Sequence, residues 1–269
     1  MRFSIASLTS GLLLSGASAT FFQKECANAD IVEHTGNPTG TIRVIQNVTT
    51  YISTPNPLSV RAIARRNTAV IYLTDIFGIE LLQNKRLADS FAKAGYLTIA
   101  PDMLEGEALP TDLNVPGLNL TEYTLRHGPA AVDPIVAKAV AYARSRPGIT
   151  KVAVTGYCFG GKYAFRFLSA GRNVDAGFTA HPSLLLDEEI SAITKPIGLA
   201  LAETDSMLPP ARRAEMEVLL QATNKPYQVS LYSGTEHGFG VRADITDPEQ
   251  KFAKEEAFLQ AVRWFDNFA

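Results

Sequence analysis

Buried strand segments alternate with helical segments from residue 68 to the C-terminus, and this alternation most constrains the fold. Residues 68–74 form a continuous apolar, β-branched run, which is typical of a strand covered on both faces. A helical pattern follows at residues 81–94, and the next apolar run, at residues 96–100, stops at Pro101. This order predicts an α/β protein with a mostly parallel sheet and helices on both faces.

The alternation continues along the rest of the chain. Further helices are expected at residues 130–144, 161–169, 211–222 and 248–268, and further strands at residues 151–155, 176–180, 197–202 and 227–232. Residues 41–53 are expected to form either a pair of strands or one long edge strand. No repeat or linker interrupts this order, so residues 20–269 are expected to form one domain.

For two further segments the sequence predicts which side chains cover a pocket or are buried. Residues 105–126 are rich in Pro, Gly and Leu without periodicity, and we expect an irregular excursion, or lid, over an apolar pocket. Its covering residues would be Leu109, Leu113, Leu118 and Tyr123. The buried face of the last helix is expected to contain Phe252, Ala257, Leu259, Val262, Trp264 and Phe265.

Charge and cysteine content exclude several classes of protein. The chain has 25 Lys+Arg against 27 Asp+Glu and no long run of one sign, so a nucleic-acid partner is not expected. Its two cysteines, Cys26 and Cys158, are too few for a disulfide framework or an all-thiolate zinc site. No His/Asp cluster has the spacing of metal ligands, and neither a metal nor another cofactor is expected.

The first 19 residues have the pattern of a secretory signal peptide. Arg2 supplies the positive charge, residues 5–14 are mainly apolar and small, and residues 17–19 read Ala-Ser-Ala, an A-x-A cleavage pattern. The apolar stretch is shorter than the roughly 20 residues that span a bilayer. A first core helix or a membrane anchor is the alternative. We predict a cleaved leader at residues 1–19 and a secreted protein without a membrane anchor.

Two glycosylation sequons fit this prediction. They begin at Asn47 and Asn119, whereas the third Asn-x-Thr, at Asn37, is blocked by its proline. With a signal peptide in front, the sequons predict a glycoprotein of the secretory pathway.

A strand–turn–helix motif surrounds Cys158. The expected strand at residues 151–155 runs into Gly-Tyr-Cys-Phe-Gly-Gly at residues 156–161, which matches the nucleophile elbow G-x-S-x-G with Cys in place of Ser. Glycines are needed there because side chains would collide with neighbouring backbone. The Phe159 amide would form half of an oxyanion hole, and the helix N-terminus would favour the thiolate. The alternative is a buried, inert structural cysteine.

A nucleophile elbow predicts an acid and then a histidine on loops after later strands. Asp205 follows the expected strand at residues 197–202, and His237 follows the one at residues 227–232. His237 would accept the thiol proton, and Asp205 would orient the imidazole. The rivals are Asp187, Glu203 and Glu236 as the acid and His34, His127 and His181 as the base. Chain order and loop position favour Asp205 and His237, while His181 either lines the site or is structural.

With these motifs the chain resembles the dienelactone hydrolase family of α/β-hydrolases over roughly residues 30–269. The resemblance is carried by IYLTDIFGI at residues 71–79, GYLTIAPD at 95–102, GYCFGG at 156–161 and HGF at 237–239. It is closest to the fungal-type branch, whose His-Thr-Gly-x-Pro-Thr-Gly opening is similar to residues 34–40.

The resemblance implies a Cys–His–Asp triad made of Cys158, His237 and Asp205. It implies an acyl-enzyme mechanism on lactones or enol esters, with no cofactor. It also implies that the backbone amide of Ile76 joins that of Phe159 in the oxyanion hole.

The chain departs from the bacterial members of the family at two places. Those members have a glutamate that interacts with the thiol where this chain has Asp75, one methylene shorter. They also have an arginine four residues after the histidine, where this chain has Val241, and Arg242 comes one residue later. Asp75, His181 and Arg242 are therefore further candidates for lining the site.

The leading interpretation is a secreted hydrolase that acts on a small-molecule ester or lactone, such as one derived from a secondary metabolite or an aromatic compound. The alternatives are acyl transfer, or an isomerase or lyase reaction, in the same site, and a binding protein that kept the fold without catalysis. Pairing with Cys26 would remove the nucleophile, so the two cysteines are expected to stay separate. The oligomeric state, monomer or dimer, is left open.

Overall fold

Within residues 31–269 eight strands form one sheet in the order β1-β2-β4-β3-β5-β6-β7-β8. Their bounds are β1 Thr41–Ile45, β2 Val48–Ser53, β3 Thr68–Leu73, β4 Leu97–Pro101, β5 Lys151–Tyr157, β6 Ala176–Ala180, β7 Ile197–Thr204 and β8 Tyr227–Glu236. Neighbours from β4 to β8 run parallel, while β1 and β2 are antiparallel additions at one edge. This mostly parallel sheet confirms the predicted α/β class.

The computed structural model describes residues 31–269. The predicted signal peptide at residues 1–19 and Cys26 lie outside the described residues, so both predictions stay open.

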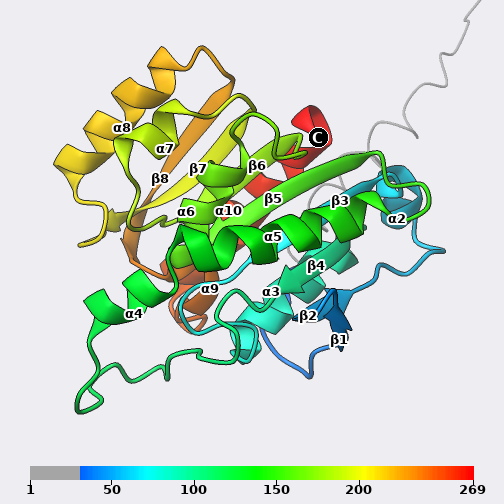
Figure 1. Ribbon diagram of the computed structural model, residues 1–269, viewed down its shortest axis with the longest axis horizontal. Helices are drawn as coiled ribbons and strands as arrows, with labels where there is room; N and C mark the ends of the chain where they lie inside the picture. The colour runs from blue at the N-terminus through cyan, green and yellow to red at the C-terminus, as the bar shows by residue number, and fades with distance from the viewer. Residues whose placement is uncertain (1–30) are drawn as a thin grey trace, which may run out of the picture. The chain divides into compact units, whose positions relative to one another are not determined.

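The helices cover both faces of the sheet (Figure 1). Their bounds are α2 Val60–Arg65, α3 Leu82–Lys93, α4 Leu120–Arg126, α5 Pro129–Arg144, α6 Phe159–Phe167, α7 Asp187–Ser191, α8 Pro210–Ala222, α9 Phe239–Arg242 and α10 Pro248–Phe268. Helices α5 and α6 pack on one face, and α3 and α10 pack on the other. No helix in this part of the chain is both long and apolar enough to cross a membrane.

Strand β3 shows why both faces are covered. Ala69, Ile71 and Leu73 join the core beneath α5 and α6, whereas Val70 and Tyr72 join the core beneath α3 and α10. Every residue of β3 is buried, as its continuous apolar run predicts.

Residues 41–53 form a strand pair rather than one long strand. Gln46 and Asn47, between β1 and β2, have φ angles of 49° and 65°. A two-residue connection with both φ angles positive is the type I′ turn that suits the twist of a hairpin. The hairpin thus decides between the two possibilities that the sequence left open.

The predicted buried face of α10 is wrong at one position. Phe252 is 61% exposed, whereas the other five residues named for this face are buried. At about 100° per residue, Phe252 lies on the opposite side of the helix from buried Ala261. Lys254 is buried instead, and its ammonium group donates to the carbonyl oxygen of Val241 (2.9 Å).

The order of the strands determines where a ligand can bind. The chain places β4 on one side of β3 and β5 on the other, so the connections that leave β3 and β5 run in opposite directions. In open α/β sheets, ligands bind at the crevice that this reversal creates at the carboxyl ends of the strands. The residues after β3 and after β5 lie side by side at that crevice.

A buried carboxylate on α3 ties the start of the described chain to the sheet. Asp89, 4% exposed, accepts hydrogen bonds from the amides of Thr39 (2.7 Å) and Gly40 (3.2 Å). It also accepts from the hydroxyls of Tyr51 (2.7 Å) and Ser53 (2.6 Å) in β2. The Thr-Gly end of the opening motif is therefore held by a charge on α3.

We predict that Asp89→Ala lowers the free energy of unfolding by about 3 kcal/mol, because buried donors lose their acceptor. Urea denaturation of the two proteins measures the difference. The matched control is Asp112→Ala, which removes an exposed carboxylate and should change stability by less than about 0.5 kcal/mol. Equal stability of the Asp89→Ala variant and the wild type would contradict this role of Asp89.

Candidate active site

Cys158 lies at the sharp turn between β5 and α6, as the elbow motif predicts. Its backbone angles, φ 52° and ψ −114°, fall in a region that non-glycine residues rarely adopt. The residue is buried, with 8% of its surface exposed, and it lines a pocket at the carboxyl end of the sheet.

The glycines around Cys158 are required by close approaches of the backbone. A Cβ atom on Gly160 would overlap the carbonyl group of Leu73 in β3, and one on Gly156 would overlap the carbonyl oxygen of Gly160. A Cβ atom on Gly161 would collide with the Thr179 side chain in β6. The three glycines therefore let α6 begin directly against β3 and β6.

Two backbone amides next to the thiol are available as hydrogen-bond donors. Phe159 is the first residue of α6, and Ile76 follows β3. Within residues 31–269 neither amide donates to an acceptor, and both residues line the pocket together with Cys158. These are the positions that the sequence assigns to the oxyanion hole.

Asp205 and His237 come together from the loops after β7 and β8. Both carboxylate oxygens of Asp205 lie 2.9 Å from Nδ1 of His237. The carboxylate is buried and also accepts a hydrogen bond from the Met207 amide (2.8 Å), which fixes its orientation. On the other side of the ring, His237 Nε2 has no hydrogen-bond partner among the described residues.

The surroundings of His237 favour its protonated form. Burial lowers its pKa, but the hydrogen bond to Asp205 and the neighbouring Cys158 sulfur raise it, and the net result is a pKa of about 9. A protonated imidazole beside a thiol favours ionisation of that thiol. His237, which lines the same pocket as Cys158, is therefore positively charged at neutral pH.

The rival acids are engaged away from the thiol. Asp187 pairs with Arg212 (2.6 Å), and Glu203 accepts a hydrogen bond from the amide of Gly234 (3.0 Å). Glu236 is exposed at the end of β8. None of these three carboxylates lines the pocket that contains Cys158.

Two of the rival histidines are also bound elsewhere. His34 bonds to Glu255 (2.8 Å), and His127 bonds to Glu107 (3.2 Å) near the end of the lid. Neither lines the pocket that contains Cys158. His237 is thus the histidine that the fold brings to the thiol.

His181 supports the site without lining the pocket. It is fully buried, and its ring packs against those of His237 (5.1 Å between centroids) and Phe239 (5.5 Å). Burial lowers the pKa of His181 well below its ordinary value, and His237 and Arg242 lower it further. The ring is therefore neutral and packs behind His237.

Asp75 is held by groups other than the thiol. Its buried carboxylate forms an ion pair with Arg242 and accepts hydrogen bonds from the Asn84 side chain (2.8 Å) and the Phe77 amide (3.1 Å). Burial raises the pKa of Asp75, although the Arg242 guanidinium opposes this shift. Arg242 also lies over the Phe77 ring (4.5 Å to its centroid) and lines the pocket.

Two residues at the site have no motif that would reveal them. Asn84 of α3 orients Asp75 and is itself oriented by the Tyr72 hydroxyl, which donates to it (2.8 Å). Ser183, in the loop after β6, has its hydroxyl oxygen 3.7 Å from the Cys158 sulfur. Ser183 comes just after β6, the strand that follows the nucleophile helix, and this position is the one sequence signal that indicates it.

The pocket has a volume of about 290 Å³ and a largely apolar lining. It is lined by Ile76, Phe77, Leu113, Leu120, Thr121, Tyr123, Thr124, Cys158, Phe159, Ser183, Leu184, Met207, His237 and Arg242. Leu113 and Tyr123 line it as predicted for the lid. Leu109 and Leu118 do not: Leu109 packs on the core, and α4 presents Leu120 to the pocket instead.

Known proteins are similar to this chain in sequence or in fold. Hydrolase pyvD of Aspergillus violaceofuscus is 36% identical over 235 residues, which cover 87% of this chain and 93% of the relative. Hydrolase tropI of Talaromyces stipitatus is 38% identical over 244 residues, covering 87% and 92%. A solved structure of a dienelactone hydrolase-like promiscuous phosphotriesterase from metagenomic libraries shares the fold, with a TM-score of 0.65 at 17% identity, covering 87% of this chain and 100% of that one.

The family assignment rests on most of the chain. Residues 51–269 match the dienelactone hydrolase family. This stretch contains the elbow, the lid and the loops that carry Asp205 and His237. The chain therefore belongs to the dienelactone hydrolase family of α/β-hydrolases, and it is a hydrolase that acts on carboxylic ester bonds.

Proposed function

We propose that this hydrolase cleaves a small ester or lactone with Cys158 as the nucleophile, His237 as the base and acid, and Asp205 as the residue that orients His237. The observation that carries the proposal is the bond between both Asp205 oxygens and His237 Nδ1, which leaves Nε2 without a hydrogen-bond partner among residues 31–269, beside the pocket that contains the thiol. A base that is oriented on one side and unpaired on the other is the arrangement that activates a nucleophile.

The acylation step follows from this arrangement. His237 holds the thiol proton, and the Cys158 sulfur attacks the carbonyl carbon, so a carbon–sulfur bond forms and the carbonyl oxygen becomes an oxyanion. The amides of Phe159 and Ile76, which have no acceptor within residues 31–269, donate to that oxygen. The carbon–oxygen bond then breaks, and His237 gives its proton to the leaving oxygen.

Deacylation repeats these roles with water. His237 accepts a proton from water, whose oxygen attacks the thioester carbon, and the thiolate leaves as the acid is released. In a lactone the leaving oxygen belongs to the same molecule, so the ring opens to a hydroxy acid.

The lining of the pocket supports an uncharged substrate. Arg242 lines it, but this cation is already paired with the buried Asp75. The other lining residues are mostly apolar, with Phe77, Leu113 and Met207 among them. Displacing water from such a lining favours an apolar body, so we propose a small aliphatic or aromatic ester or lactone without a carboxylate.

We also propose that the protein is secreted and glycosylated. The signal-peptide pattern of residues 1–19 supports secretion. The two sequon asparagines, Asn47 and Asn119, are exposed, which supports their access to the glycosylation machinery.

We predict that Cys158→Ala lowers the rate of p-nitrophenyl acetate hydrolysis by at least about 10³-fold, because the remaining groups cannot form the acyl intermediate. Release of p-nitrophenol from the purified mature chain measures this. Cys26→Ala is the matched control and should leave the rate unchanged. A Cys158→Ala variant as active as the wild type would refute the proposed nucleophile.

The same assay tests the apolar character of the pocket with a matched substrate pair. p-Nitrophenyl butyrate and mono-p-nitrophenyl succinate have acyl chains of equal length, and only the second ends in a carboxylate. We expect a kcat/KM at least about tenfold higher for the butyrate, since among the described residues no unpaired cation lines the pocket to offset the desolvation of a carboxylate. Equal or reversed values would contradict the proposed substrate class.

We predict that Asp205→Asn lowers the pKa of His237 from about 9, because the carboxylate that favours the imidazolium is lost. NMR titration of the imidazole protons measures the change, with Asp187→Asn as the matched control. Since the unfolded chain releases this proton near pH 6.5, the stabilisation from protonated His237 is complete below about pH 6.5 and is lost as pH rises to about 9. An unchanged titration in Asp205→Asn would contradict the assignment of the acid.

A further inference from the structure

Ser183 lies next to the sulfur of Cys158. Its hydroxyl oxygen is 3.7 Å from the sulfur, and within residues 31–269 this hydroxyl has no other hydrogen-bond partner. Its backbone amide donates to the carbonyl oxygen of Cys158 (3.1 Å). The residue is 3% exposed and lines the pocket, so its hydroxyl is a buried donor whose available acceptor is the sulfur.

The loop that carries Ser183 has an unusual backbone. His181 and Leu184 have φ angles of 38° and 58°, which non-glycine residues rarely adopt. The surrounding structure must hold such a conformation in place. Side chains from two helices do so: Lys162 of α6 donates to the carbonyl oxygen of Leu184 (3.2 Å), and Arg212 of α8 donates to that of Leu185 (3.1 Å).

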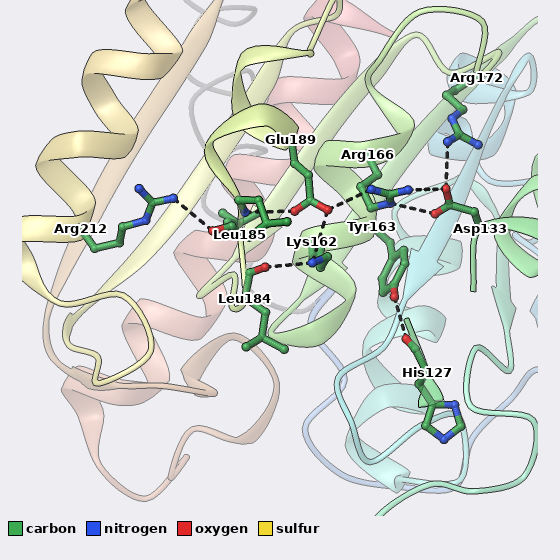
Figure 2. A network of polar contacts seen from close by, with 11 residues as sticks. His127, Asp133, Lys162, Tyr163, Arg166, Arg172, Leu184, Leu185, Glu189 and Arg212 are labelled. Carbon is green, nitrogen blue, oxygen red and sulfur yellow. Dashed lines mark hydrogen bonds and ion pairs between the residues drawn. The ribbon is translucent and has the colours of Figure 1, made fainter. Parts of the chain in front are cut away.

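Figure 2 shows that these contacts belong to a larger network of charges. Glu189 of α7 accepts a hydrogen bond from the amide of Leu186 (3.1 Å) and lies 3.4 Å from Lys162. Arg166 of α6 joins Glu189 (3.0 Å) to Asp133 of α5 (2.6 Å). The Ser183 loop is thus fixed by α6, α7 and α8, and the position of its hydroxyl is set by the fold.

We propose that the Ser183 hydroxyl donates a hydrogen bond to the Cys158 thiolate and so increases the fraction of the thiol that is ionised. A thiolate has no hydrogen to donate, so in that state the hydroxyl can act only as the donor. A hydrogen bond to the charged form of a group favours that form. This assignment rests on the proposed function, in which the thiolate is the attacking group.

Ser183 and His237 both favour the thiolate, but by different means. The imidazole supplies the positive charge and moves the proton, whereas the hydroxyl is neutral and leaves the charge of the site unchanged. Among the described residues, the other ionisable side chains around this end of the pocket are His181, His237, Asp205, Asp75, Arg242 and Tyr123, and Lys162 and Arg212 contact the Ser183 loop. Replacing Ser183 alters none of these charges, so a change in thiol ionisation would report the lost hydrogen bond.

The test is the pH dependence of Cys158 alkylation by iodoacetamide, followed by peptide mass mapping to separate Cys158 from Cys26. For Ser183→Ala we expect the midpoint of the profile to rise by about one pH unit, which corresponds to about tenfold slower alkylation below both midpoints. Hydrolysis of p-nitrophenyl acetate should show a lower kcat at neutral pH with KM changed less than about twofold.

Three further variants separate the hydroxyl from packing. Ser183→Thr and Ser183→Val have nearly the same shape, and only the first keeps a hydroxyl, so the first should retain the wild-type midpoint and the second should match Ser183→Ala. Ser169→Ala removes a hydroxyl at the far end of α6, where it donates to the carbonyl oxygen of Arg166, and should leave the profile unchanged. If Ser183→Ala does not fold, the comparison of Ser183→Thr with Ser183→Val still tests the hydrogen bond.

Coincident profiles for the wild type and Ser183→Ala, or equal shifts in the threonine and valine variants, would overturn the assignment. Alkylation needs no substrate, so it tests Ser183 separately from the proposed function. If Cys158→Ala hydrolyses esters as fast as the wild type, the proposed function fails, whereas a shifted alkylation profile would still establish the contact between Ser183 and the thiol.

Discussion

The close approach of helix α6 to strand β3 is the contact on which the rest of the site depends. Gly160 packs directly against the carbonyl group of Leu73, where any side chain would overlap. This approach lets the turn before α6 hold Cys158 at a positive φ and brings the amide of Phe159 to the same pocket as that of Ile76. Strands β3 and β5 lie side by side, and the connections that leave them run in opposite directions. This order creates the opening into which these groups project.

Two buried carboxylates near the thiol have different roles because they have different partners. Asp205 is bound to His237, so its charge acts on the imidazole that faces the thiol. Asp75 is bound to Arg242 and Asn84, so its charge is paired behind the pocket, which Arg242 lines and Asp75 does not. An aspartate therefore orients a histidine in one place and pairs with an arginine in the other, so among residues 31–269 both cations that line the pocket, His237 and Arg242, have a carboxylate partner.

The sequence predicts those parts of the fold and site that leave a local pattern. Buried parallel strands such as β3 leave continuous apolar runs, and the order of Cys158, Asp205 and His237 identifies the residues that the fold brings together. The sequence does not predict helices α2, α4, α7 and α9, because helices of one or two turns show little periodicity. Helix α4 lies within residues 105–126, so the prediction of a wholly irregular lid is wrong at its C-terminal end. The pairing of Asp75 with Arg242 joins residues 167 positions apart, and the contact of Ser183 with Cys158 depends on a loop fixed by three helices. At Phe252 the sequence pattern predicts burial and the structure shows exposure, since an aromatic residue on a helix is not always buried.

We propose that Cys158 carries the acyl group, and trapping of that intermediate tests this proposal most directly. The mature chain is mixed with p-nitrophenyl acetate, quenched in acid within the first turnover, digested and mapped by mass spectrometry. We predict an acetyl group on Cys158 whose amount rises with the burst of p-nitrophenol and falls as the substrate is exhausted. A burst without acetylation of Cys158, or an acetyl group on another residue that turns over at the same rate, would contradict the account.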